Sequence, residues 1–98
     1  MLIGSKTSIG AHCCIDRGTI RDTTIADLVM IDNFVHIAHN VEIGKKTVIL
    51  AQAGIAGSCI IGQSCIIGGQ AGIADHVRIA SGSVILSCLL YTSPSPRD

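Results

Sequence analysis

Isoleucine recurs at every sixth position from Ile25 to Ile85, and the residue two positions before each one is also restricted in type. That second position holds Val29, Val35, Val41, Thr47, Ala53, Cys59, Cys65, Ala71, Val77 and Ser83. Residues i and i−2 of a strand point to the same side. Each unit therefore predicts a short strand that directs these two side chains into one interior and the residue between them outward, with turn-forming residues after each Ile.

Three six-residue units make an eighteen-residue coil, and the sequence supports this longer period independently. "AQAGIA" at 51–56 and "GQAGIA" at 69–74 match at that offset after the first residue. We therefore predict an all-β fold, a parallel β-helix of triangular section built as a single-stranded solenoid. Residues eighteen apart become vertical neighbours about 4.8 Å apart. The spacing alone does not give the handedness.

The repeat also predicts the boundaries of the solenoid. Ile3, Ile9 and Ile15 keep the six-residue spacing in another phase, because four extra residues lie within 16–24, which we interpret as a polar loop inserted in one coil. Residues 1–87 are expected to form the β-helix. The last residues, 88–98, do not continue the six-residue repeat (the hexad) and resemble a translated sequencing adaptor. We therefore expect a non-native or disordered tail. The open ends and flat faces of such a solenoid require cover from other domains or subunits.

The composition of the chain excludes several classes of function. Hydrophobic residues make up 48% of the 98 residues but aromatic ones only 2%, and the net charge is zero. Balanced charge argues against a non-specific nucleic-acid or membrane-surface binder, and no apolar run reaches the ~18 residues of a transmembrane segment. The five cysteines form no CxxC pair, and Cys13, Cys59 and Cys65 occupy the small interior position. They are expected to be reduced, buried thiols in a cytoplasmic protein.

One predicted edge of the prism collects candidate catalytic residues. His39 and His76 are 37 positions apart, one more than two coils, and Gly57 lies between them, eighteen residues after His39. A histidine can remove a proton from a nucleophile, and an exposed backbone N–H beside it can stabilise an oxyanion, which together suffice for acyl transfer. The alternative is an ordinary solvated polar corner.

Two other interpretations fit less well. Three histidines on such a prism can bind zinc between subunits, but His36 and His39 flank a turn in a way that makes joint ligation awkward. No metal site is therefore expected. An ice-binding or purely structural solenoid would show a regular outward row of one residue type, which this sequence lacks.

The segments "CIDRGTIRDTTI", "IDNFVHIAHNVEIG", "AGIAGSCIIG" and "GGQAGIADHVRI" carry a family resemblance. The hexads resemble the left-handed β-helix acyltransferases. The full set of segments, over residues 2–87, is similar to the UDP-3-O-acylglucosamine N-acyltransferases of lipid A biosynthesis. The resemblance implies transfer of a 3-hydroxyacyl group from acyl carrier protein to the amine of a UDP-sugar, without a cofactor. It also implies a homotrimer with active sites between subunits. The nucleotide-binding domain and C-terminal helices of the family lie outside this chain, which we interpret as a central slice.

By motif match, the resemblance implies His39 as the general base, Asp32 as its support and Gly57 as the oxyanion-stabilising N–H. His76 is implied as a contributor to substrate or carrier-arm binding, although Asp75 stands where the family usually has glycine. Asn33 and Asn40 fall in the same motifs and are expected to contact substrate.

Two alternatives remain open from the sequence. One is the sister O-acyltransferase that acts on UDP-N-acetylglucosamine, whose I-A-H segment typically continues with Asp rather than Asn40. The other is a non-catalytic β-helix that serves only for trimerisation.

Overall fold

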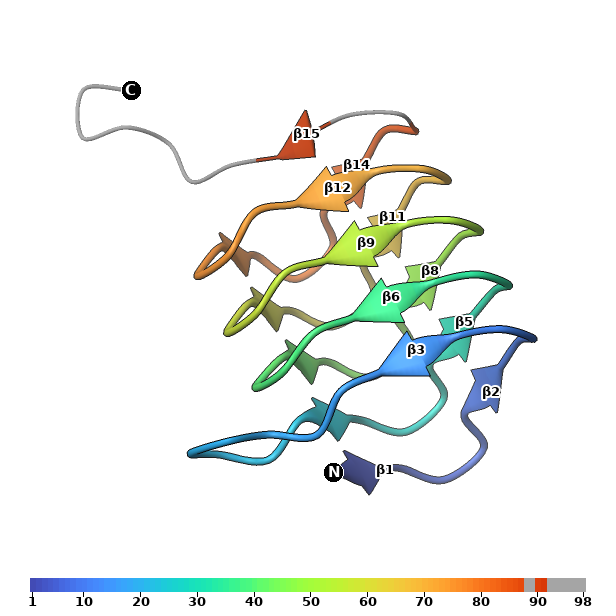
Figure 1. Cartoon of the computed structure of the whole chain (residues 1–98). Coiled ribbons are helices and arrows are strands. Elements are labelled where there is room, and N and C mark those ends of the chain that lie inside the picture. Colours follow the sequence, from blue (N-terminus) through green and yellow to red (C-terminus); the bar gives the residue numbers. More distant parts are fainter. Residues whose placement is uncertain (88–89, 92–98) are drawn as a thin grey trace.

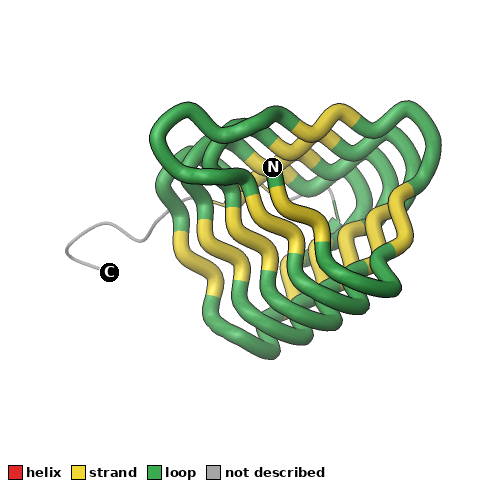
Figure 2. The backbone as a smooth tube through the Cα atoms, turned by 90° about the horizontal axis from the view of Figure 1, so that it is seen from below, coloured by secondary structure: helices red, strands yellow, loops and turns green. Residues whose placement is uncertain are grey.

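The computed structural model describes residues 1–87 and 90–91, and within them the chain winds as a triangular prism with one short parallel sheet on each side (Figures 1 and 2). Sheet A contains β1 (Leu2–Ile3), β4 (Thr24–Ile25), β7 (Glu42–Ile43), β10 (Ile60–Ile61) and β13 (Arg78–Ile79). Sheet B contains β2 (Ser8–Ile9), β5 (Met30–Ile31), β8 (Val48–Ile49), β11 (Ile66–Ile67) and β14 (Val84–Ile85). Sheet C contains β3 (Cys14–Ile15), β6 (His36–Ile37), β9 (Gly54–Ile55), β12 (Gly72–Ile73) and β15 (Leu90–Tyr91).

The predicted register is confirmed. Ile37 pairs with Ile55, and Ile55 pairs with Ile73, so the coil length is eighteen residues in this part of the stack. Across the inserted loop the offset becomes twenty-two, as in the pairing of Ile15 with Ile37. The loop therefore leaves the sheets intact and adds chain only at one corner.

The core is aliphatic and follows the two predicted positions of each hexad. Ile37, Ile49 and Ile55 are fully buried, whereas Ile3 and Ile9 in the first coil are 48% and 38% exposed. Each fully buried Ile contributes about 1.5–3 kcal/mol through removal of apolar surface from water. The interior coils therefore supply most of the stability.

Each regular corner contains one residue in the left-handed backbone region. Among the described residues, eleven of these are not glycine: Lys6, His12, Leu28, Phe34, Asn40, Lys46, Gln52, Ser58, Ser64, Gln70 and His76. This conformation is costly for most L-residues. Hydrogen bonds between the backbones of successive corners, such as Ser58 N–H to the His39 carbonyl at 2.9 Å, help to stabilise it.

The cysteine prediction is confirmed for Cys59 and Cys65, which are buried, and Cys13 in the first coil is half-buried. Cys13, Cys14, Cys59 and Cys65 are all unpaired thiols. Burial raises the pKa of the Cys59 thiol, whose Sγ lies 2.9 Å from the Ala74 carbonyl oxygen. This thiol is therefore a packing group rather than a nucleophile.

The end of the chain differs from expectation at one point. Leu90–Tyr91 forms β15, which pairs with β12 in the ordinary register, although we expected no solenoid beyond residue 87. The exposed edge of β12 offers unpaired N–H and C=O groups, with which any extended dipeptide can pair. The rest of the expected tail, residues 88–89 and 92–98, lies outside the described residues.

Candidate active site

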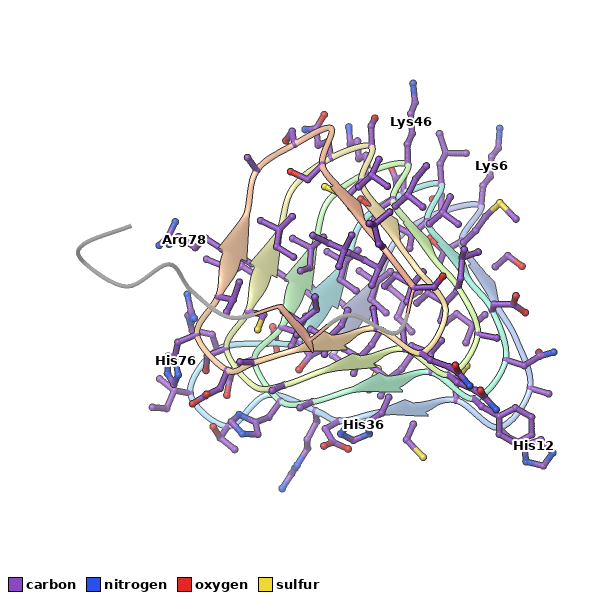
Figure 3. The ribbon with its side chains drawn as sticks, turned by 90° about the horizontal axis from the view of Figure 1, so that it is seen from above. Lys6, His12, His36, Lys46, His76 and Arg78 are labelled. Atoms are coloured by element: carbon purple, nitrogen blue, oxygen red, sulfur yellow. The ribbon has the colours of Figure 1, made fainter. Side chains whose placement is uncertain are left out.

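The three residues predicted to share an edge do share one. The C–A edge is formed by the corners that leave sheet C for sheet A: residues 38–41, 56–59 and 74–77, with the loop 16–23 below them. Ser58 N–H donates to the His39 carbonyl at 2.9 Å, and His76 N–H donates to the Gly57 carbonyl at 3.0 Å. His39, Gly57 and His76 therefore lie in successive coils of one edge. Figure 3, viewed down the prism, shows His76 at this corner, with His12 and the pair Lys6 and Lys46 at the other two.

The imidazole of His39 occupies the space above Gly57. A Cβ at position 57 would lie 2.6 Å from Cε1 and 2.7 Å from Nε2 of His39, closer than atoms can approach. Gly57 is thus required for space rather than for its backbone conformation, since its φ is not positive. Its N–H donates to no acceptor within the described residues, a property that several other corners share. What distinguishes Gly57 is an imidazole directly beside that free donor.

Nδ1 of His39 lies 3.0 Å from Oδ1 of Asn40, while Nε2 has no hydrogen-bond partner among residues 1–87. Asn40 is 5% exposed. Its side-chain amide contacts the loop 16–23: Oδ1 accepts from Thr19 Oγ1 at 2.9 Å, and Nδ2 donates to the Arg21 carbonyl. Asn40, expected from the motif to contact substrate, therefore has its polar atoms engaged inside the chain.

The side chain of His76 is much more exposed to solvent than the residues of the corner 56–59 in the preceding coil. Its Nδ1 lies 3.2 Å from Oδ2 of Asp75, and both side chains are about three-quarters exposed. Within the described residues, both side chains of this pair are open to solvent.

Asp32 and Asn33 do not join His39 within one chain. They lie on the B–C edge, which β6 and the full width of sheet C separate from the C–A edge. Asn33 Oδ1 accepts a hydrogen bond from Ala11 N–H at 2.8 Å, and Asp32 Oδ1 accepts one from Asn33 N–H at 2.8 Å. Asn33 thus ties two corners together. Asp32 also borders a groove of about 260 Å³ whose walls include Met30 and Leu50.

The histidines do not assemble a metal site in one chain. His36 points outward from the middle of sheet C, where its Nε2 lies 4.0 Å from Oδ2 of Asp16. Among the described residues, no three His, Cys, Asp or Glu side chains are arranged to hold a metal ion. Nor does the described part contain a helix with the length and apolar character that crossing a membrane requires.

The outer face of sheet B is apolar. Its outward residues after Ser8 are Met30, Val48, Ile66 and Val84, and three of these are 42–60% exposed. The corresponding positions on sheet A include Thr24, Glu42 and Arg78. One side of the prism is thus suited to packing against another protein surface.

The sequence did not lead us to predict the residues of the preceding coil that contact the corner at His39. Thr19, Arg21 and Thr23 all contact Asn40, and Thr23 Oγ1 accepts from the Asn40 N–H at 2.9 Å. The spacing of the repeat nevertheless indicates where the inserted loop lies. The insertion follows Ile15, which pairs with Ile37, so the loop must lie one coil below His39.

Comparison with known proteins agrees with this geometry. Residues 22–57 match the family model for the bacterial transferase hexapeptide. The chain is 49% identical over 85 residues to a UDP-3-O-acylglucosamine N-acyltransferase of Caulobacter, covering 87% of this chain and 25% of the relative. It is 52% identical to a probable mitochondrial enzyme of the same name from Arabidopsis thaliana, covering 98% and 32%. The chain thus spans about a quarter to a third of these relatives.

Solved structures show the same architecture. LpxA from Acinetobacter baumannii superposes with a TM-score of 0.87 at 33% identity, over 96% of this chain and 39% of that one. The UDP-N-acetylglucosamine acyltransferase from Campylobacter jejuni superposes with a TM-score of 0.74 at 26% identity, over 94% and 40%. The resemblance inferred from the sequence is therefore confirmed, and the chain belongs with the hexapeptide-repeat, left-handed β-helix acyltransferases.

Proposed function

We propose that this chain provides the catalytic edge of an N-acyltransferase in lipid A biosynthesis. The names of the sequence relatives support transfer of an acyl group to the amine of UDP-3-O-acylglucosamine. The family resemblance of the sequence implies that the donor would be a 3-hydroxyacyl group on acyl carrier protein. The observation that carries the proposal is the His39 ring lying against Gly57, with Nε2 unpartnered and the Gly57 N–H free in the described part of the chain.

These two groups suit attack of an amine on a thioester. Nε2 of His39 takes a proton from the amine as the new C–N bond forms. The negative charge that develops on the carbonyl oxygen is stabilised by the Gly57 N–H. The tetrahedral intermediate then collapses, the C–S bond breaks, and the imidazolium returns its proton to the departing thiolate. In this proposal His76, which is exposed on the same edge, contacts the substrate or the arm of the carrier protein.

Asp32 supports His39 in this proposal only if it comes from a second copy of the chain, because it lies on another edge of its own prism. A homotrimer with sites between subunits provides that arrangement, and the apolar face of sheet B offers the packing surface. Unpaired thiols are usual in a reducing compartment, so we place the protein in the cytoplasm.

A second candidate is transfer to a hydroxyl of UDP-N-acetylglucosamine, because the similar structure from Campylobacter jejuni carries the name of that acyltransferase. Against it stand the sequence relatives, which are 42–57% identical and carry the N-acyltransferase name. Supplying each acceptor separately to the enzyme distinguishes the two activities.

The test uses a chimera in which the matched coils of the Caulobacter relative are replaced by residues 2–87 of this chain, since the chain spans only part of such enzymes. His39→Ala is expected to abolish transfer of the acyl group while circular dichroism stays unchanged. His76→Ala is expected to be milder and to act partly on the affinity for acyl carrier protein.

The pH dependence gives an independent check of the base. Protonated imidazole cannot accept a proton, so turnover is expected to fall at acid pH. Near-normal turnover of His39→Ala, or turnover that does not change as the solution is acidified, contradicts a histidine base.

A further inference from the structure

The two nitrogens of a neutral imidazole are not equivalent, because one carries the proton and only the other can act as a base. At His39 the neighbouring group at Nδ1 is Oδ1 of Asn40, 3.0 Å away. If this atom is the amide oxygen, it can only accept. The proton must then lie on Nδ1, and Nε2 must hold the lone pair.

The orientation of the Asn40 amide follows from its other partners. Nδ2 faces the carbonyl oxygen of Arg21, which can only accept. Oδ1 faces the hydroxyl of Thr19 at 2.9 Å and the N–H of Thr19 at 3.5 Å. A flipped amide would place two oxygens against each other at Arg21 and two N–H groups against each other at Thr19. The oxygen therefore faces His39.

Asn40 is itself held in place. Its backbone N–H donates to Thr23 Oγ1 at 2.9 Å, its φ is 61°, and its side chain is almost completely buried. Asparagine tolerates this left-handed conformation better than most residues. The four-residue insertion supplies Thr19 and Arg21, so the loop 16–23 fixes the amide that contacts the histidine.

We propose that Asn40 is a positioning residue, oriented by the loop 16–23, that holds neutral His39 in the Nδ1–H tautomer and leaves Nε2 as the base. The catalytic consequence rests on the proposed function, whereas the tautomer is a property of the chain itself. Solvent-exposed histidines favour the opposite, Nε2–H form. His36 provides an internal contrast, because its Nε2 rather than its Nδ1 faces a carboxylate, that of Asp16.

The tautomer is measured directly by two-bond ¹H–¹⁵N correlation spectra of the full chain, labelled with ¹⁵N-histidine, at a pH above the titration of its histidines. His39 is expected to show a protonated Nδ1 and an unprotonated Nε2, and His36 the reverse. A wild-type spectrum with His39 mainly in the Nε2–H form overturns the proposal without any variant.

The variant Asn40→Gly removes the amide while suiting the positive φ, so the corner can keep its backbone. It is expected to shift His39 to the Nε2–H form. Ser58→Gly, at the same corner position one coil higher with φ of 62°, is the matched control and should leave the His39 signals unchanged. An unchanged tautomer in Asn40→Gly contradicts the proposal. Asn40→Asp keeps an oxygen acceptor and should retain the wild-type tautomer.

The kinetic measurement distinguishes a failure of the Asn40 proposal from a failure of the proposed function. In the acyl-transfer assay, Asn40→Gly should lower kcat by about tenfold with little change in KM. Without the Asn40 amide, the His39 ring still populates the Nδ1–H tautomer for part of the time. The expected loss of kcat is therefore far smaller than the ~10⁴-fold loss that follows when a catalytic histidine is held in the wrong tautomer. If the wild-type chimera is active but His39 is not in the Nδ1–H tautomer, the role of Asn40 is refuted and the proposed function stands. If His39 is in that tautomer but the wild-type chimera transfers no acyl group, the proposed function is refuted and the tautomer assignment stands.

Discussion

Gly57 illustrates how much of the site depends on the absence of one side chain. The repeat placed Gly57 beside His39, so the sequence predicted that the two residues meet. It did not predict that the ring lies in the space a Cβ would need, because that depends on the rotamer of His39. The same limit applies to Asn33 and Asn40: the motif marked them for substrate, yet their side chains bond to Ala11 and to the loop 16–23. Hydrogen-bond partners of this kind depend on three-dimensional contacts that spacing does not encode.

Gly57→Ala is expected to push the imidazole away from its position and to break the contact between Nδ1 and Asn40. The fold should survive, because the clash involves a side chain and φ is not positive at Gly57. We expect displaced His39 resonances and a loss of acyl transfer of at least about tenfold, since a misplaced group of this kind costs up to ~10²-fold.

The control is Gly54→Ala, three residues earlier, where an added Cβ meets no atom within 4 Å. It should leave both the His39 signals and the activity unchanged. Equal behaviour of the two alanine variants would mean that the ring does not depend on the space above Gly57.

At the scale of the element, the strands were the best-predicted feature. In the part of the chain that the structure describes, fourteen of the fifteen two-residue strands end at an Ile of the six-residue repeat. A β-branched residue at a fixed period specifies both the strand and its inward face. The sequence predicted the position of the inserted loop, but it did not predict which residues the loop contacts. β15 was not expected, since Leu90–Tyr91 lacks the hexad and is recruited by an open strand edge rather than by its own pattern.

Strands in the middle of the stack should matter more than those at its end. Ile55→Ala in β9 is expected to lower the free energy of unfolding by about 2–5 kcal/mol, because the side chain is fully buried between two coils. Ile3→Ala in β1 removes the same atoms from a residue that is 48% exposed, so it should cost at most about half as much. Urea unfolding monitored by circular dichroism measures both. Equal losses would show that the first coil is covered in solution.

The whole molecule presents two different edges and one apolar face to its surroundings. Its prism shape followed from the eighteen-residue period, whereas the outer surface could not be derived from it, because outward positions are free of the core's constraints. The position of Asp32 on the B–C edge and His39 on the C–A edge means that one prism alone cannot bring them together. The proposed trimer resolves this by pairing edges of adjacent copies.

Mixed assemblies test this arrangement. In the chimera, Asp32→Asn and His39→Ala are each expected to be inactive alone. Co-expression should restore part of the activity, because some interfaces then combine an intact Asp32 from one copy with an intact His39 from another. A double variant carrying both changes on one chain is the control and should restore none when mixed with either single variant. A mixture of the single variants that stays inactive would contradict a site shared between copies.

The in-register stacking of identical corners, seen where the Gln52 and Gln70 amides meet at 2.8 Å, has a consequence for how such a chain changes in evolution. A tandem duplication or loss of one complete turn in the gene rejoins the polypeptide at equivalent points, so the cross-section survives and only the length of the prism changes. Insertions of any other size must be accommodated as a protrusion at a corner, as residues 16–23 are. This lineage can therefore lengthen its body in whole turns and add new surface chemistry by local inserts, independently of each other.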